Sequence, residues 1–191
     1  MWSRRIVFLL LAGVCQVSYG QKLPPLPYMD WGACPFECCT YRGWEATREV
    51  KIYTSRKEGS KISFVLAKGE LAIGVTGVVL TKSYGITKIL KPVKIGYTPV
   101  STAPELSLKA GDFVYTLHYA GEASDFFWYR GSVYTDQILV PEIAMGSSPN
   151  EQSIEIVSRP DYEWWVKVQN KAGRVGWTKE TKVFAHMDAC E

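Results

Sequence analysis

The feature of this chain that most restricts its fold is a run of short strand-like segments separated by glycine. From Glu49 onward, segments rich in β-branched and aromatic residues follow one another, among them VKIY, ISFVL, ELAIGV and FVYTLHY. Such residues favour a pleated sheet, and single glycines between them are typical of turns. No stretch of helical length carries a sustained apolar period of 3.6 residues. The sequence therefore predicts an all-β protein.

Part of this strand pattern occurs twice. One copy begins with VKI at Val50 and the other with VKI at Val93. Each continues through a loop and an apolar pair to a turn of glycine and an acidic residue, Gly69-Glu70 or Gly111-Asp112, before a long strand. A repeat of this kind predicts two similar small barrels in tandem. The predicted boundaries are 49–91 for the first barrel and 92–184 for the second.

The end of the chain predicts a closing hairpin, in which NKAG forms the turn and RVGWT returns the chain. Alternation places Trp164, Val166 and Val168 on one face of its first strand. Trp165, Lys167 and Gln169 lie on the other face. Trp165 is therefore the candidate for an exposed ring, and the alternative is that it packs on an inserted or cysteine-rich segment.

A segment over 123–161 separates the second long strand from this hairpin and departs from a simple barrel. It predicts an extra hairpin over Phe126–Asp136, followed by a loop. We expect any specific function to lie there. The proline-rich stretch Lys22–Asp30 is expected to be an extended spacer, and its Pro24-x-x-Pro27 pattern is alternatively a ligand for aromatic grooves.

Residues 1–20 are typical of a secretory signal peptide. The basic start MWSRR precedes a short apolar run over Ile6–Val14, and Ser18 and Gly20 occupy the small-residue positions before a cleavage site. The apolar run is too short to span a bilayer, which needs about 20 residues. We expect an exported, periplasmic or extracellular protein that begins at Gln21 and has no transmembrane segment in its mature chain.

Cleavage of the signal peptide would leave four cysteines, which are Cys34, Cys38, Cys39 and Cys190, and export would place them in an oxidising compartment. An even number in an oxidising compartment indicates two disulfides. A bond between Cys38 and Cys39 is disfavoured because a trans peptide holds their Cα atoms about 3.8 Å apart, below the usual range of about 4.4–6.8 Å. Cys190 is therefore expected to bond to one of these neighbours and Cys34 to the other. This would tie the tail 185–191 to the segment 21–48.

These features together resemble bacterial SH3-like barrels. The resemblance rests on the glycine-acid turns and above all on the closing hairpin Trp164–Thr178, and it spans roughly Val50–Phe184. The whole chain is also similar to a group of exported bacterial proteins that pair a CPFECC start, here Cys34–Cys39, with such a hairpin and a final DAC, here Asp188–Cys190. The resemblance implies a fold and a compartment, and it implies no activity.

Residues suited to catalysis are few. Nucleophilic catalysis by cysteine needs an imidazole within hydrogen-bonding distance, and the chain holds only His118 and His186. In the strand YTLHY, Tyr115, Leu117 and Tyr119 share one face, so His118 is expected to point to the other face as a structural residue. The acidic residues occur at turns, and no glycine-rich phosphate loop is present. We expect a protein without enzymatic activity or cofactor.

A metal site is the alternative use of the cysteines. If the two ends of the chain meet, Cys34, Cys38, Cys39, His186 and Cys190 would offer five candidate ligands, and zinc favours such closely spaced residues. Zinc needs thiolates, however, and an oxidising compartment converts thiols to disulfides. The alternative function is therefore a zinc- or thiol-dependent exported protein that uses this cysteine cluster.

Aromatic surface suggests the main function. The chain holds 7 tryptophans and 11 tyrosines, and its net charge is only +3 with the basic residues scattered among acids. Nucleic acid is therefore not an expected partner. Exposed aromatic rings beside polar groups suit sugars, peptides and proteins. We expect a binding or scaffolding protein of the cell envelope that recognises a peptide, a protein or peptidoglycan. The expected groove consists of Trp165, Trp128, Tyr129 and Tyr53.

Overall fold

The computed structural model describes residues 22–95, 106–136 and 153–190. The expected signal peptide and the expected loop of the insertion, over 137–152, lie outside these residues. The described parts consist of antiparallel strands and one short 3-10 helix, η3 (Thr181–Val183), so the all-β prediction is confirmed. None of the helical structure in these parts is long and apolar enough to cross a membrane.

The larger sheet has eight strands in the order β15-β2-β5-β13-β14-β3-β4, with β1 also paired to β5. Its strands are β1 (Tyr28–Trp31), β2 (Gly43–Ala46), β3 (Val50–Tyr53), β4 (Ile62–Leu66), β5 (Leu71–Ser83), β13 (Asp161–Gln169), β14 (Val175–Thr178) and β15 (Phe184–Ala185). The predicted strands VKIY and ISFVL are therefore β3 and β4, and the predicted closing hairpin is β13 and β14.

The smaller sheet has five strands in the order β11-β10-β9-β6-β12, and β7 pairs with β8 in a separate ribbon. These strands are β6 (Gly85–Ile89), β7 (Val93–Ile95), β8 (Leu106–Leu108), β9 (Phe113–Gly121), β10 (Ser124–Tyr129), β11 (Ser132–Asp136) and β12 (Ile154–Ser158). The extra hairpin predicted over Phe126–Asp136 is present as β10 and β11.

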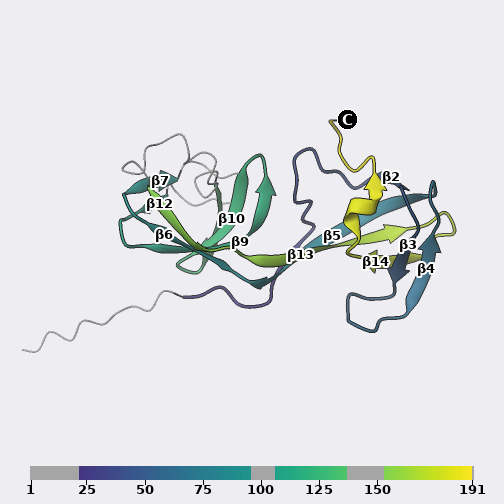
Figure 1. Ribbon diagram of the computed structural model, residues 1–191, viewed down its shortest axis with the longest axis horizontal. Coiled ribbons are helices and arrows are strands. Elements are labelled where there is room, and N and C mark those ends of the chain that lie inside the picture. The colour runs from purple at the N-terminus through teal and green to yellow at the C-terminus, as the bar shows by residue number, and fades with distance from the viewer. Residues whose placement is uncertain (1–21, 96–105, 137–152, 191) are drawn as a thin grey trace, which may run out of the picture.

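The two long strands β5 and β13 run between two units of the molecule (Figure 1). β5 ends at Ser83 and β13 begins at Asp161, and these two residues are register partners. The strands β6 to β12 between them form what we call the second unit. The strands on either side form the first unit, which is completed by β13 and β14 through their pairing with β5 and β3. The strands therefore do not follow the predicted division into 49–91 and 92–184, because the second unit is inserted into the first.

The two units share the same order of strands. The order β15-β2-β5-β13-β14 of the first unit corresponds to β12-β6-β9-β10-β11 of the second. The irregularity in the pairing recurs as well, because the register shifts between Lys167 and Val168 where β13 faces β5, and between Phe126 and Phe127 where β10 faces β9. The repeat seen in the sequence thus has a counterpart in strand topology.

The glycine-acid turns are equivalent in the two units. The Gly69 N–H donates to the carbonyl of Ala46 at 2.7 Å, and the Gly111 N–H donates to the carbonyl of Ile89 at 2.8 Å. Both glycines have a positive φ, +83° and +90°, a conformation that costs glycine little.

The acidic residue after each of these glycines closes its turn. The Glu70 carboxylate accepts a hydrogen bond from the Ala67 N–H at 2.7 Å. The Asp112 carboxylate accepts one from the Lys109 N–H at 2.9 Å. A side-chain acceptor of this kind satisfies a turn amide that has no strand partner, which explains why both copies of the repeat carry an acid there.

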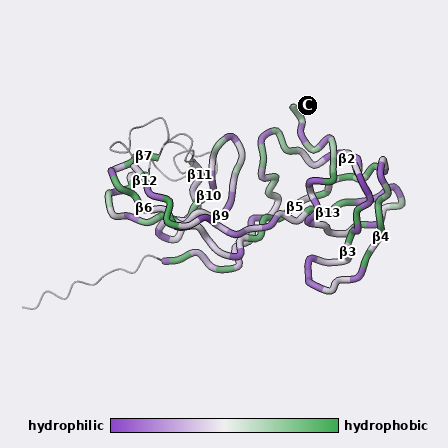
Figure 2. The backbone as a smooth tube through the Cα atoms, viewed as in Figure 1, coloured by the Kyte–Doolittle hydropathy of each residue, from purple (hydrophilic) through white to green (hydrophobic). Residues whose placement is uncertain are grey.

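Each unit buries its own hydrophobic core, and Figure 2 shows apolar positions recurring along the strands of both. In the first unit, Val166 and Val168 of the closing hairpin pack with Ile52 and Phe64 around the fully buried Trp44. The core of the second unit includes Ile89, Val93, Ile95, Leu108, Val114, Phe127, Tyr129 and Ile154. The apolar face of the hairpin therefore explains why β13 and β14 belong to the first unit.

One disulfide lies within the cysteine-rich segment, and a second joins that segment to the carboxyl-terminal tail. Cys34 bonds to Cys39, and Cys38 bonds to Cys190 across a separation of 152 residues. Hydrogen bonds reinforce this contact: the Ala189 N–H donates to the carbonyl of Cys38 at 2.8 Å, and the Arg42 guanidinium donates to the carbonyls of His186 and Asp188. Cys190 is thus bonded to the first of its two expected partners.

Candidate binding groove

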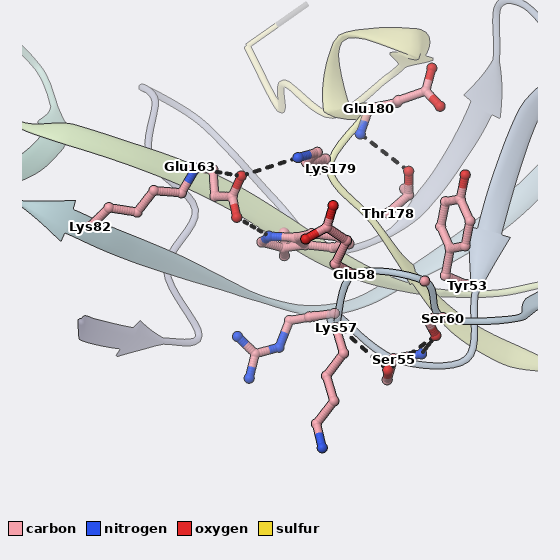
Figure 3. Close-up of a pocket in the computed structure, with 13 residues that line it drawn as sticks. Tyr53, Ser55, Lys57, Glu58, Ser60, Lys82, Glu163, Thr178, Lys179 and Glu180 are labelled. Carbon is pink, nitrogen blue, oxygen red and sulfur yellow. Dashed lines mark hydrogen bonds and ion pairs between the residues drawn. The ribbon is translucent and has the colours of Figure 1, made fainter. Parts of the chain in front are cut away.

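A groove of about 610 Å³ opens on the first unit. One wall is the loop over 54–61, which joins β3 to β4, and the other is formed by Glu163 of β13 and by Thr178, Lys179 and Glu180 at the end of β14 (Figure 3). Tyr53 and Trp165 also line it. The groove therefore has aromatic walls and charged rims.

Trp165 lies in this groove but is not the freely exposed ring that alternation suggested. Only 8% of the residue is accessible to solvent. Its indole N–H donates to the Glu163 carboxylate at 2.9 Å, and the Lys179 ammonium lies 5.6 Å from its ring centre. These charged neighbours cover the indole, which forms a fixed wall.

Glu163 holds this wall together. Its carboxylate accepts the Trp165 bond and also lies 3.2 Å from the Lys82 ammonium and 3.3 Å from that of Lys179 (Figure 3). Burial alone would raise the pKa of the carboxyl, but the bonds from Trp165, Lys82 and Lys179 outweigh it and leave the pKa below its ordinary value. The carboxylate is therefore ionised at neutral pH.

A stack of an arginine and two tryptophans borders the groove. The Arg56 guanidinium carbon lies 4.7 Å from the ring centre of Trp31 and 5.3 Å from that of Trp177. The two indoles meet edge to face, with 6.3 Å between their centres. Arg56 lines the groove, and Trp177 is the register partner of Tyr53. Strands β1 and β14 and the loop over 54–61 thus bring three distant segments to one surface.

The structure brings together only part of the predicted groove. Tyr53 and Trp165 line it, whereas Trp128 and Tyr129 lie on β10 in the second unit and are buried. The Trp128 indole N–H donates to the carbonyl of Lys22 at 2.7 Å, so the amino-terminal segment contacts it. The Tyr129 hydroxyl donates to the Asp112 carboxylate at 2.8 Å. Burial and this bond raise the pKa of Tyr129 to about 12.

The sequence did not predict that Trp31, Arg56 and Trp177 would lie in or beside the groove. Trp31 directly follows the expected spacer Lys22–Asp30, whose last three residues belong with Trp31 to β1, which pairs with β5. For Trp177 a signal was available, because alternation along RVGWT places it on the face opposite the buried Thr178. Arg56 lies in a loop, where no periodicity predicts a contact.

The residues that were considered as alternative metal ligands make other contacts in the structure. All four cysteines of the described residues are in disulfides, and a disulfide sulfur is no thiolate ligand. Ligand atoms of Cys38, Asp188 and Cys190 lie within 4.8 Å of one another. His186 is exposed, with its Nε2 atom 3.9 Å from the Glu45 carboxylate.

His118 has the surroundings of a structural residue. It is buried, and its Nε2 atom lies 3.1 Å from the Asp30 carboxylate while its Nδ1 atom lies 2.8 Å from the carbonyl of Tyr119. Both ring nitrogens therefore lie at hydrogen-bonding distance from protein oxygens, as is typical of a buried histidine held in place by the fold. A cavity of about 270 Å³ adjoins the pair.

The groove has the chemistry of a binding site. Aromatic rings offer flat apolar contacts, the fixed Glu163 carboxylate offers an acceptor, and Arg56 and Lys57 offer donors. No family model, curated protein or solved structure matches this chain.

Proposed function

We propose that this protein is a non-enzymatic binding or scaffolding protein of the cell envelope. Its ligand is a peptide, a protein or peptidoglycan, and the aromatic groove of the first unit is the binding site. The signal-peptide pattern and the two disulfides support export. The expected resemblance to bacterial SH3-like barrels supports the same compartment.

One observation carries the proposal: the groove of Tyr53 and Trp165 adjoins the stack of Trp31, Arg56 and Trp177. Trp31 is 56% exposed although it is large and apolar. Exposed aromatic residues next to a groove favour ligand binding, since their rings bury area at little cost in conformational entropy.

The groove suits an extended polar chain better than a compact apolar ligand. Its rims carry lysine and glutamate side chains from both walls, and an arginine from the loop over 54–61 (Figure 3). Peptide backbones and amino sugars present amides and hydroxyls to such rims while their apolar parts contact aromatic rings.

Co-sedimentation with purified cell-wall sacculi tests this proposal. We expect the oxidised protein to sediment with the wall, and Trp31→Ala and Tyr53→Ala to lower retention by about tenfold, as loss of aromatic anchors does. Phe113→Ala, which removes a partly exposed aromatic side chain from the second unit, serves as the control. Equal retention of all three variants and the original protein would exclude the groove.

A zinc- or thiol-dependent protein that uses Cys34, Cys38, Cys39, Cys190 and His186 remains the alternative. It requires both disulfides to open, because zinc binds thiolates. Intact mass under non-reducing conditions distinguishes the two: two disulfides lower the mass by about 4 Da relative to four thiols. Free thiols with stoichiometric zinc in the exported protein would favour the alternative.

A further inference from the structure

We propose that Arg56 is a carboxylate-binding residue and that the ligand of the groove carries a free carboxylate beside an apolar group. This inference rests on the proposed function, because it assigns ligand chemistry to the same groove. It follows from the charge balance of the groove, from the way Arg56 is held, and from the aromatic surface around it.

The first step is the charge balance. The cations of the groove are Arg56, Lys57, Lys82 and Lys179, and its acids are Glu58, Glu163 and Glu180. Glu163 bonds to both Lys82 and Lys179, and Glu180 bonds to Arg48 outside the groove at 3.2 Å.

The loop over 54–61 keeps an excess of positive charge. Among the described residues, the structure shows no ion pair for Arg56 or Lys57. Glu58 is the acid that accompanies them in the loop. Lys61 adds a third cation to the loop, so cations exceed acids by two on this side, which favours an anionic ligand.

The second step is the geometry of Arg56. The guanidinium is held by two indoles, with distances of 4.7 and 5.3 Å from its carbon to the ring centres. Cation–π contacts of this kind use none of the N–H donors of a guanidinium. No hydrogen bond from this side chain to another described residue occurs. Arg56 thus keeps N–H donors that suit bidentate contact with a carboxylate.

The third step is the apolar surface beside the guanidinium. Trp31 is largely exposed, and Tyr53 and Trp165 continue the aromatic surface into the groove. A ligand whose carboxylate reaches Arg56 would lay its neighbouring apolar side chain on these rings. We therefore favour an extended peptide with a terminal or side-chain carboxylate. Inorganic phosphate fits this surface less well, because it carries no apolar group that could lie on the rings.

Titration of the full oxidised chain, followed through the indole N–H resonances of Trp31 and Trp177, tests the inference. The probes are N-acetylphenylalanine, its uncharged amide, and inorganic phosphate, each at millimolar concentration. We expect the carboxylate to bind about tenfold more tightly than the amide, as a charge-assisted bidentate contact allows. Phosphate is expected to bind more weakly than the carboxylate.

Variants test whether Arg56 causes the preference for the carboxylate over the amide. Arg56→Gln is expected to make the carboxylate and the amide bind equally weakly, and Arg56→Lys to restore only part of the difference, because lysine keeps the charge and loses the planar donors. Arg130→Gln is the matched control, since Arg130 also stacks on an aromatic ring, that of Tyr129 at 4.9 Å, but in the second unit.

Three results would overturn the inference: equal binding of carboxylate and amide by the original protein, tighter binding of phosphate, or the same loss in the Arg130 variant. Its failure is distinguishable from failure of the proposed function. If Arg56→Gln still sediments with sacculi while Trp31→Ala does not, the groove binds the wall without using Arg56 as a carboxylate site.

Discussion

The imidazole of His118 and the carboxylate of Asp30 join the amino-terminal strand to the second unit. His118 Nε2 lies 3.1 Å from Asp30 Oδ2, although 88 residues separate the two in the chain. The imidazole also contacts the rings of Phe126 and Tyr162, with centre distances of 5.0 and 6.0 Å. The contact thus connects β1, β9, β10 and β13 at the junction of the two units.

Removing the acceptor from this pair should destabilise the fold. Asp30→Ala leaves the buried imidazole without a partner at Nε2, and we expect the free energy of unfolding to fall by about 1–3 kcal/mol. Asp30→Asn keeps an acceptor oxygen and should cost less. Urea denaturation measures both, with Asp161→Ala on the exposed start of β13 as the control. Equal effects of the three substitutions would contradict the structural importance of the pair.

The two disulfides should differ in their contribution to stability. In the chain-entropy account, the Cys38–Cys190 bond across 152 residues stabilises by about 5 kcal/mol. The Cys34–Cys39 bond across 5 residues stabilises by about 2 kcal/mol. Paired serine substitutions at each bond, followed by thermal unfolding, measure the order. A larger loss from removal of the short-range bond would refute this expectation.

Gly176 should tolerate no side chain. A Cβ atom there would lie 2.6 Å from the carbonyl oxygen of Tyr53 and 2.6 Å from Ile52 Cγ2. We expect Gly176→Ala to destabilise the protein by about 1–3 kcal/mol, as overpacking does. It should also weaken ligand binding because it displaces Tyr53. Gly43→Ala is the control, since nothing lies within 4 Å of its added Cβ. Calorimetry and the sacculus assay measure the two effects.

Acid should remove the stabilising contacts that the Glu163 carboxylate makes in the groove. Since the folded-state pKa of its carboxyl lies below the ordinary value of 4.5, its stabilising bonds are complete above pH 4.5 and are lost as the pH falls through the folded-state pKa. The stability difference between the original protein and Glu163→Gln should therefore shrink as the pH is lowered from 7 to 3. Urea midpoints measure it, with Glu155→Gln on β12 as the control. A difference that is constant with pH would contradict this role.

The first unit should fold without the second. Ser83 and Asp161 are register partners, so a two-residue Asn-Gly turn in place of residues 84–160 would join β5 to β13 as a hairpin. We expect the shortened chain to form both disulfides and disperse its tryptophan resonances, with lower stability because it lacks His118. A shortened chain that stays unfolded would show that the second unit is needed to hold the first together.

Strand positions could be predicted from the sequence, but strand partners could not. Alternation of β-branched residues located β3 and β4, and NKAG located the turn between β13 and β14. Alternation assigns a face to each residue without specifying which strand lies beside it. The pairing of β13 with β5 therefore could not be predicted, since it depends on core packing of Val166 and Val168 in the first unit.

The site was partly predictable for a related reason. The expectation that His118 is structural agrees with its burial and bonds. Trp165 and Tyr53 were placed in a groove from residue type and strand face. The burial of Trp165 was not predictable because Glu163, two residues earlier on the same strand, and Lys179, just after β14, cover its ring. Trp31 reaches the groove only through the pairing of β1 with β5, a contact between distant segments.

Insertion of one unit into the other also sets an order of assembly. During synthesis from the amino terminus, β5 emerges long before β13, so β5 lacks its neighbour in the first unit until the second unit has emerged. Once the inner unit folds, it holds Ser83 and Asp161 close together and lowers the entropic cost of closing the outer sheet. The insertion therefore favours closure of the first unit after the second has folded, and the Cys38–Cys190 bond can form only once Cys190 has been synthesised.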